Sequence, residues 1–195
     1  MYININHVKI EVFIIIRVVS GEKKGFLLKT SKKLNIKPTL SRVKENIFNI
    51  LREKIPNSIG LDLFAGYGSI AIEALSRNAS KVILVEKNKK AVYFIKKNLE
   101  KTNYLEKTKI FNCSWDVFLN KNKFFFDWIY VDPPYFLNNY CDIINGIVKK
   151  KCLKDDGILI VETFKNKEIF KKNLDFYCYK KVLYGNILIC FFKKI

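Results

Sequence analysis

The sequence is poor in the residues that support metal, thiol and histidine chemistry. It contains one histidine, His7, close to the amino terminus. Its five cysteines are odd in number and include no C-x-x-C pair: Cys113, Cys141, Cys152, Cys178 and Cys190. Ser-His or Cys-His catalysis and histidine-based metal binding are therefore not serious options, and neither a zinc site nor a disulfide framework is expected. This cysteine usage indicates a reducing compartment, and we expect a cytoplasmic protein.

Long hydrophobic runs are also lacking. The apolar stretch Val12–Ile16 is bracketed by Glu11 and Arg17, is too short to span a bilayer, and lacks a signal-peptide cleavage pattern. It is typical of a β-strand. We therefore expect no membrane partner.

Acidic residues are scarce relative to basic ones. The 195-residue chain has 18 Asp and Glu against 36 Lys and Arg, a formal net charge of +18. Such an excess favours a polyanionic partner, either nucleic acid or an anionic membrane surface. Part of the lysine content is also what an AT-rich genome would produce, but nucleic acid is the preferred interpretation. The length suits one domain with a small extension, and 49% hydrophobic residues are enough for a real core.

The first part of the chain is predicted to be an extension made of β-structure, covering residues 1–38. A strand over Val8–Val19 and a second over Phe26–Leu28 flank the basic turn Gly21–Gly25, a pattern that predicts a hairpin. Residues 39–195 are predicted to form the main domain.

The main domain is predicted to begin with a helix. Apolar residues at helical spacing indicate that it runs to about Arg52, and Thr39 or Ser41 can cap its start. Pro56 ends this segment.

Strands and helices then alternate. Strands are predicted at Gly60–Phe64, Lys81–Glu86, Lys109–Asn112, Phe126–Val131 and Gly157–Val161, and helices at Ser69–Arg77, Lys89–Asn98, Tyr140–Lys149 and Lys165–Lys172. The β-rich runs Phe176–Leu183 and Asn186–Phe192 surround Tyr184-Gly185 and predict a terminal hairpin. The pattern indicates an α/β fold with a seven-stranded, mostly parallel sheet, helices on both faces and a C-terminal antiparallel hairpin at one edge.

A glycine-rich turn lies between the strand ending near Phe64 and the following helix. Gly66 and Gly68 allow the backbone to pass close to a ligand, and Ala71 permits tight packing of helix against strand. Glu86 ends the next strand, where an acid can accept hydrogen bonds from two ribose hydroxyls. The pattern suits an adenosine-containing cofactor, although a packing turn that binds nothing would have the same spacing.

Asp62 helps to choose the cofactor. An acid at this strand end repels a pyrophosphate but attracts the cationic amino group of S-adenosylmethionine (SAM), so SAM is favoured over NAD. Because the carboxyl ends of parallel strands meet at one edge, Asp62, Glu86 and Asp132 are expected to converge on one crevice.

The stretch Asp132-Pro133-Pro134-Tyr135 follows an apolar strand. Two prolines force a turn, which presents an acid, a rigid carbonyl and an aromatic ring at the strand end. This trio suits an enzyme that holds a flat base and acts on its exocyclic amine, with Tyr135 and Phe136 available for stacking. An Asp-Pro-Pro turn can also be only a turn.

These motifs, in this order, resemble the RsmD family, SAM-dependent enzymes that methylate the N2 amine of a guanine in bacterial 16S rRNA. The resemblance extends from about residue 17 to the end, through Arg17-Val18-Val19-Ser20-Gly21 with Lys24-Gly25, Lys37-Pro38-Thr39, Arg42-Val43-Lys44-Glu45, Ile47-Phe48-Asn49, Leu61 to Gly68, Glu73 to Arg77, and Tyr184-Gly185. It implies a Rossmann-like methyltransferase, with SAM as cofactor and no metal. The implied partner is 16S rRNA or the assembling small ribosomal subunit. The oligomeric state is open, and a monomer is the default expectation.

The resemblance also assigns site residues. Those at the target base are Asp132, Pro133, Pro134 and Tyr135, and those at the cofactor are Asp62, Phe64, Gly66, Gly68, Glu86, Ser114 and Trp115. Ser114 stands where the family often has Asp or Asn, and Trp115 replaces a small residue. Basic residues of the hairpin and first helix are expected to contact RNA phosphates: Lys23, Lys24, Lys37, Arg42 and Lys44.

Other functions remain open at this point. A DNA or RNA adenine-N6 methyltransferase would share the chemistry, but DNA enzymes usually carry a target-recognition region for which 195 residues leave little room. A non-catalytic RNA-binding protein could retain the fold, and intact Asp132–Tyr135 opposes that interpretation. An NAD-dependent oxidoreductase is the weakest alternative, because Asp62 opposes a pyrophosphate.

Overall fold

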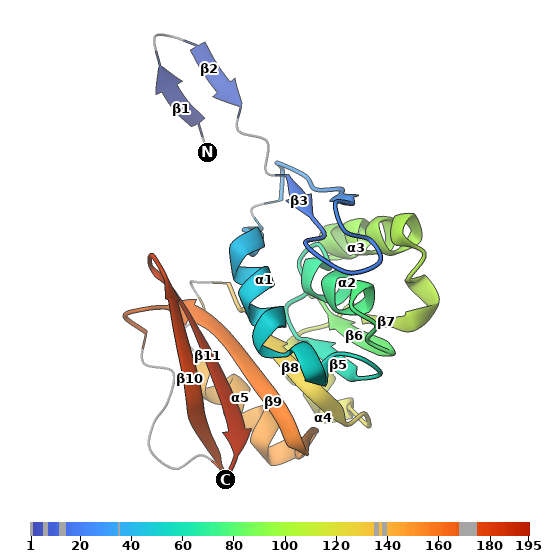
Figure 1. The fold of residues 1–195 in the computed structure, drawn as a ribbon, viewed down its shortest axis with the longest axis vertical. Helices are drawn as coiled ribbons and strands as arrows, with labels where there is room; N and C mark the ends of the chain where they lie inside the picture. Colours follow the sequence, from blue (N-terminus) through green and yellow to red (C-terminus); the bar gives the residue numbers. More distant parts are fainter. Residues whose placement is uncertain are drawn as a thin grey trace.

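The computed structural model contains a seven-stranded mixed sheet (Figure 1). It describes residues 2–5, 8–11, 15–34, 36–134, 137, 140–167 and 175–195. For residues 2–5 and 8–11 it describes only the backbone. The sheet strands are β5 (Ile59–Asp62), β6 (Lys81–Val85), β7 (Thr108–Phe111), β8 (Phe126–Val131), β9 (Leu153–Phe164), β10 (Phe176–Tyr184) and β11 (Ile187–Lys194).

The strand order is β10-β11-β9-β8-β5-β6-β7. Strands β5 to β9 pair in parallel, whereas β11 is antiparallel to both β9 and β10. The predicted seven-stranded, mostly parallel sheet with an antiparallel hairpin at one edge is therefore confirmed. Strand β9 is longer than predicted because it pairs with β8 on one side and with β11 on the other.

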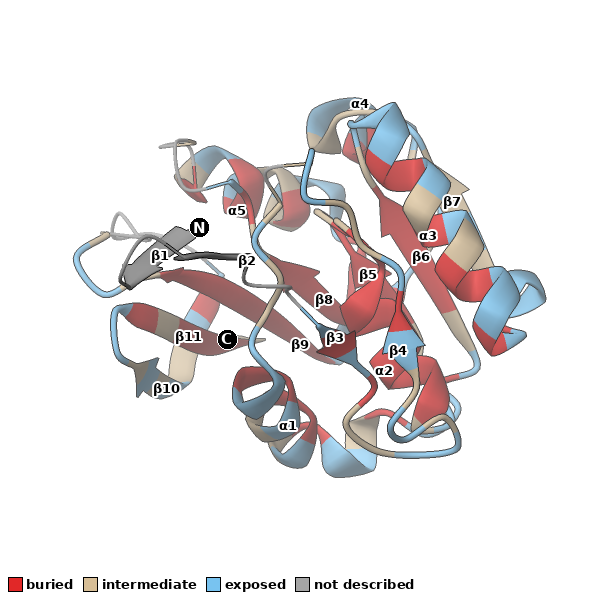
Figure 2. Ribbon diagram, turned by 90° about the horizontal axis from the view of Figure 1, so that it is seen from above, coloured by how far each residue is buried: buried red, intermediate tan, exposed pale blue. Residues whose placement is uncertain are grey.

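Helices cover both faces of the sheet, as predicted. Helices α1 (Ser41–Ile50), α2 (Ser69–Ser76) and α3 (Lys89–Thr102) pack on one face, and α4 (Trp115–Lys121) and α5 (Tyr140–Lys150) pack on the other. The segments η1 (Arg52–Lys54) and η2 (Leu105–Lys107) are short 3-10 helices. Figure 2 shows the buried strands between these two layers. No helix in the described part of the chain is long and apolar enough to cross a membrane.

Three local predictions are wrong or incomplete. Neither Thr39 nor Ser41 caps α1; the N-cap residue is Leu40, and no side chain caps that end. Helix α4 was not predicted, because seven residues are too few to show a clear helical period. The helix predicted at Lys165–Lys172 begins instead as a turn, and residues 168–174 lie outside the described residues.

The amino-terminal region contains two antiparallel hairpins. Strand β1 (Tyr2–Ile5) pairs with β2 (Val8–Glu11), and β3 (Ile16–Arg17) pairs with β4 (Leu27–Leu28). The second hairpin contains the predicted basic turn. The first was not predicted as a separate unit.

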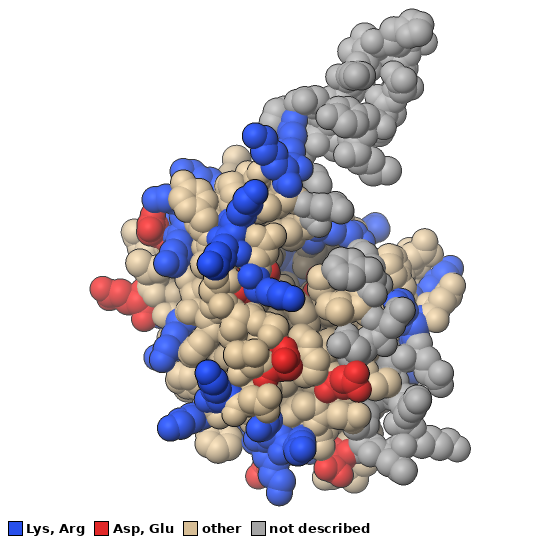
Figure 3. Space-filling model, turned by 180° about the vertical axis from the view of Figure 1, so that it is seen from behind, with Lys and Arg blue, Asp and Glu red and all other residues tan. Residues whose placement is uncertain are grey.

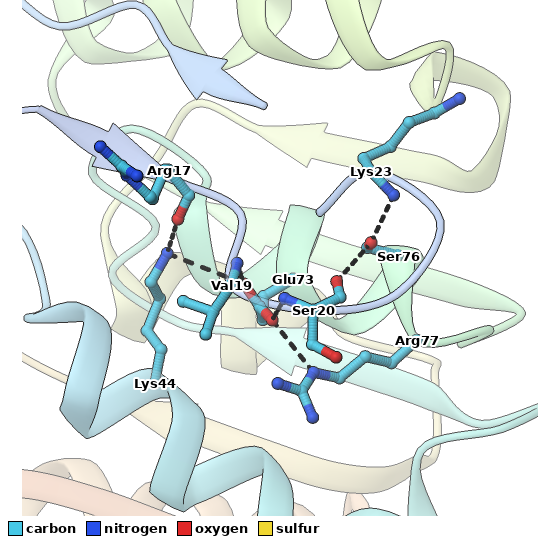
Figure 4. A network of polar contacts seen from close by, with 8 residues as sticks. All are labelled: Arg17, Val19, Ser20, Lys23, Lys44, Glu73, Ser76 and Arg77. Carbon is cyan, nitrogen blue, oxygen red and sulfur yellow. Dashed lines mark hydrogen bonds and ion pairs between the residues drawn. The ribbon is translucent and has the colours of Figure 1, made fainter. Parts of the chain in front are cut away.

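A buried carboxylate fixes the second hairpin to the main domain (Figure 4). Glu73 of α2 is 0% exposed and accepts hydrogen bonds from the Val19 and Ser20 backbone N–H groups at 2.7 and 2.9 Å. It also accepts one from Arg77 Nε at 3.0 Å and lies 3.8 Å from Lys44 Nζ of α1. One side chain thus joins the hairpin to two helices.

Candidate functional site

The order in which successive strands are added to the sheet reverses between the parallel strands β5 and β8. The strand that follows β5 in the chain lies on one side of this pair, and the strand that follows β8 lies on the other. Loops leaving the two carboxyl ends therefore diverge, which is where open α/β sheets bind ligands. Asp62 ends β5, Asp132 follows β8 and Glu86 follows β6, so three acids lie at this edge.

Asp62 is a buried acid whose carboxylate oxygens have no hydrogen-bond partner within the described part of the chain. It is 1% exposed. Burial, and secondarily the nearby Glu86 charge, raise the pKa of Asp62 to about 7, while the Ala71 backbone N–H opposes the rise. An unsatisfied buried carboxylate is costly unless a ligand supplies a cation or hydrogen-bond donors. The residue is suited to a cationic amino group.

The glycine-rich turn and Glu86 are joined directly. Gly66 and Gly68 have φ values of +55° and +77°, which side chains rarely adopt, and Gly68 is the N-cap residue of α2. The Gly66 N–H donates to Glu86 Oε2 at 2.9 Å, and the Asn88 N–H donates to Oε1 at 2.8 Å. Burial raises the pKa of Glu86, and these N–H groups oppose that rise. Phe64 is partly buried at the start of the turn.

The Asp-Pro-Pro turn places a second acid beside Asp62. Asp132 is partly exposed as a residue, but its carboxyl group is buried. Burial, then the charges of Glu162 and Asp62, raise the pKa of Asp132 well above its usual range, and Lys37 opposes the rise. Pro133 is buried and Pro134 is exposed. Tyr135 and Phe136 lie outside the described residues, so their stacking role stays a prediction.

A segment that we call the strap, residues 29–34 and 36–39, runs from the second hairpin to α1. Asn98 of α3 accepts from the Lys29 N–H at 2.7 Å and donates to the Lys29 carbonyl at 3.0 Å. Tyr67 Oη donates to the Ser31 carbonyl at 2.9 Å. Ile36 Cγ2 would lie 3.2 Å from a Cβ placed on Gly66. The strap therefore lies against the glycine-rich turn.

Ser114 and Trp115, which were assigned to the cofactor, have different surroundings. Ser114 is the N-cap residue of α4, and its hydroxyl lowers the pKa of Asp116 through a hydrogen bond. Trp115 Cζ3 would lie 3.2 Å from a Cβ on Gly146, so the indole packs against α5. The structure thus gives Trp115 a packing contact, and its role at a cofactor remains a prediction.

Most of the basic residues assigned to RNA lie at the surface. Lys24, Lys37 and Arg42 are exposed, and Lys23 is partly exposed and paired with Glu22 at 2.7 Å. In Figure 3, Lys and Arg side chains outnumber acidic ones on the upper part of the face seen from behind.

Lys44 requires a correction, because its side chain is 1% exposed. It donates to the Arg17 carbonyl at 2.7 Å, and burial lowers its pKa, with Glu73 opposing that change. It therefore cannot meet an RNA phosphate in this arrangement.

Sequence reasoning missed a third buried acid near the Asp-Pro-Pro turn. Glu162 of β9 is 1% exposed, and its Oε2 accepts a hydrogen bond from the Tyr130 hydroxyl of β8. The available signal was a glutamate inside an otherwise apolar strand run, since buried acids are rare.

Comparisons with known proteins agree on one family. A family model described as Conserved hypothetical protein 95 matches residues 16–193. Ribosomal RNA small subunit methyltransferase D of Haemophilus influenzae is 36% identical over 157 residues, covering 79% of this chain and 81% of its own. The protein of the same name from Escherichia coli K12 is 30% identical over 148 residues, covering 76% and 74%. The Escherichia coli structure of yhhF, designated a methyltransferase, has a TM-score of 0.83 and 25% identity, covering 92% of this chain and 98% of its own.

Proposed function

Because the chain belongs to the Conserved hypothetical protein 95 family, the RsmD family of rRNA methyltransferases, we propose that it methylates rRNA, and specifically that it transfers a methyl group from SAM to the exocyclic N2 amine of a guanine in small-subunit rRNA.

The observation that carries this proposal is the buried carboxylate of Asp62, which has no hydrogen-bond partner among the described residues and lies where the strand order reverses. The amino group of SAM would satisfy it, whereas a pyrophosphate would be repelled. Glu86, already bonded to the Gly66 N–H, would accept from the ribose hydroxyls. The left-handed Gly66 and Gly68 let the backbone approach the cofactor. Phe64, Ser114 and Trp115 would complete this side of the site.

When bound, SAM supplies an electrophilic methyl group beside the Asp-Pro-Pro turn. In our proposal Asp132 accepts a hydrogen bond from one N–H of the target amine, and the Pro133 carbonyl accepts the other. The two prolines hold these acceptors in place beforehand, so that little ordering remains during the reaction. The raised pKa of Asp132 makes it a suitable acceptor for the proton that the methylated amine releases.

The target base must leave its stack, which costs a few kcal/mol and favours a loop or single-stranded site. Tyr135 would return about 1–3 kcal/mol by stacking on it. Lys23, Lys24, Lys37 and Arg42 would hold the phosphates. In this proposal residues 1–38 are an RNA-facing extension of a methyltransferase domain formed by residues 39–195.

The test is transfer of labelled methyl from SAM to small-subunit rRNA, as naked RNA and as subunits, taken from cells that lack the modification. We expect label on one guanine with the native protein and with the Asp156→Ala control, whose side chain is exposed. Asp132→Ala should bind SAM and lose most of the transfer. Label on an adenine would replace guanine-N2 by adenine-N6 chemistry. Absence of label while SAM still binds would contradict the proposal.

A further inference from the structure

The strand register places Glu162 next to Asp132. Tyr130 of β8 pairs with Ile160 of β9, and Val131 pairs with Val161, so the next position along both strands brings Asp132 beside Glu162. Side chains two residues apart on a strand share a face. Tyr130 and Asp132 therefore point to the same side as Glu162, and the hydrogen bond from Tyr130 to Glu162 agrees with this geometry.

Contacts from the strap complete this group. Thr39 Oγ1 of the strap lies 3.5 Å from the Tyr130 hydroxyl. Lys37, also in the strap, lies close enough to oppose the pKa rise of both Glu162 and Asp132, and its Nζ is 5.7 Å from the centroid of the Phe164 ring, two residues beyond Glu162. The cation next to the two acids thus comes from a segment distant in sequence.

Such a pair of carboxylates is unfavourable as a purely structural element. Neighbouring strands lie about 4.8 Å apart, so like charges at paired positions on them repel each other. Burial also penalises the ionised form of both acids. Apolar residues line the same face of β8 and β9, at Trp128 and Ile158. A hydrophobic residue at position 162 would pack there without this penalty. The presence of the buried acid Glu162 beside Asp132, the acid assigned to the target amine, therefore indicates a role in the reaction.

We propose that Glu162 acts in methyl transfer through Asp132: its negative charge, held by Tyr130 and balanced by Lys37, strengthens Asp132 as acceptor of the proton that the methylated amine releases. This inference rests on the proposed function. In the reaction, the bond from the amine nitrogen to the methyl carbon forms while the carbon–sulfur bond breaks, and its electron pair stays on sulfur. One N–H proton then passes to Asp132. Glu162 touches neither substrate nor cofactor and is a positioning residue.

The charges around both acids agree with this role. Asp132 faces Glu162, Asp62 and Lys37, and the two acids raise its pKa while the lysine lowers it. Burial raises the pKa of Glu162, whereas the Tyr130 hydrogen bond and Lys37 favour its ionised form. Removing the charge of Glu162 should therefore make Asp132 easier to ionise, and removing Lys37 should make it harder.

Two variants with opposite expected effects test the inference. Glu162→Gln keeps an acceptor for Tyr130 but removes the charge, so the acid limb of the pH–kcat profile should move to lower pH by about one to two units, with a lower plateau. Lys37→Met should move the limb to higher pH. Glu53→Gln, at an exposed position of η1, should leave it unchanged.

The same shifts are measurable without turnover. In the cofactor-free protein, carbon-13 NMR of labelled aspartate carboxyls reports the titration of Asp132 directly, with Asp132→Asn identifying its signal. The inference is overturned if Glu162→Gln and Lys37→Met fail to shift that titration in opposite directions. It is also overturned if Glu162→Gln lowers kcat equally at every pH, since that indicates only structural damage.

A failure of the proposed function has a different signature. The native protein would then transfer no methyl group to rRNA, whatever the titration of Asp132. If Glu162→Gln does not fold, Tyr130→Phe replaces it. Loss of the Tyr130 hydroxyl favours protonation of Glu162, so the acid limb of the pH–kcat profile should move to lower pH, by less than in Glu162→Gln. A limb that does not move would overturn the inference.

Discussion

Loss of Glu73 should destabilise the protein more than loss of any exposed glutamate. Glu73→Ala removes a fully buried carboxylate and leaves the Lys44 ammonium, 1% exposed, without its anionic partner. The Val19 and Ser20 N–H groups also lose their acceptor. Breaking a buried ion pair by removing one partner costs about 3–5 kcal/mol. Since domains of this size are stable by about 5–15 kcal/mol, the loss is a large fraction of the total.

Urea unfolding, followed by tryptophan fluorescence, measures this cost. The matched control is Glu100→Ala, which breaks an exposed pair with Lys97 at 3.0 Å and should change the unfolding free energy little. Adding Lys44→Met to Glu73→Ala should recover part of the loss, because no uncompensated charge then remains buried. Equal costs for the Glu73 and Glu100 variants would refute the reasoning, as would a double variant less stable than Glu73→Ala.

Three further predictions concern charge. The folded-state pKa of Asp62, about 7, exceeds its unfolded value, so the contribution of this residue to stability is lost as pH rises from about 4 through 7. Asp62→Asn should therefore raise the unfolding free energy of the cofactor-free protein at pH 8 by up to about 4 kcal/mol, and should change it little at pH 4, as measured by urea unfolding. In the proposed function the ionised carboxylate of Asp62 binds the amino group of SAM. The affinity of the native protein for SAM should then rise by up to about tenfold per pH unit as pH increases towards 7, and calorimetry on Asp62→Asn should show no such dependence. Lys24→Ala should weaken RNA binding at every sequence and reduce the slope of log affinity against log salt by about 1, whereas Lys24→Arg should leave the slope unchanged. An unaltered slope in Lys24→Ala would remove this residue from the RNA contact.

The sheet and the acids at its carboxyl edge, Asp62, Glu86 and Asp132, could be predicted from the sequence because the patterns that indicate them are local. Strands β5, β6 and β8 are four to six residues long and mostly apolar, and an acid at the end of a parallel strand necessarily lies at the carboxyl edge. The amino-acid pattern alone is therefore enough to assign the three acids to that edge.

Lys44 and Glu162 could not be assigned in this way. Lys44 follows Val43 and stands three residues before Ile47, so its position on the buried face of α1 could be predicted from the helical spacing. A lysine there is normally turned to solvent, and its burial is explained by two partners distant in sequence, the Arg17 carbonyl and Glu73 of α2. The proposed role of Glu162 likewise depends on the pairing of β8 with β9, which brings Glu162 beside Asp132 and is not visible in the sequence.

Helix α2 has a geometric consequence for substrate selection. One end begins at Gly68 of the glycine-rich turn, and the other carries Glu73 and Ser76, which hold the basic hairpin. Eight helical residues span about 12 Å and bend little. In the proposed function, the helix would therefore be a fixed spacer between the methyl donor and the RNA phosphates that the hairpin would bind. A guanine would be chosen by its distance from a backbone feature of the folded RNA, so neighbouring bases could vary without changing which one is modified.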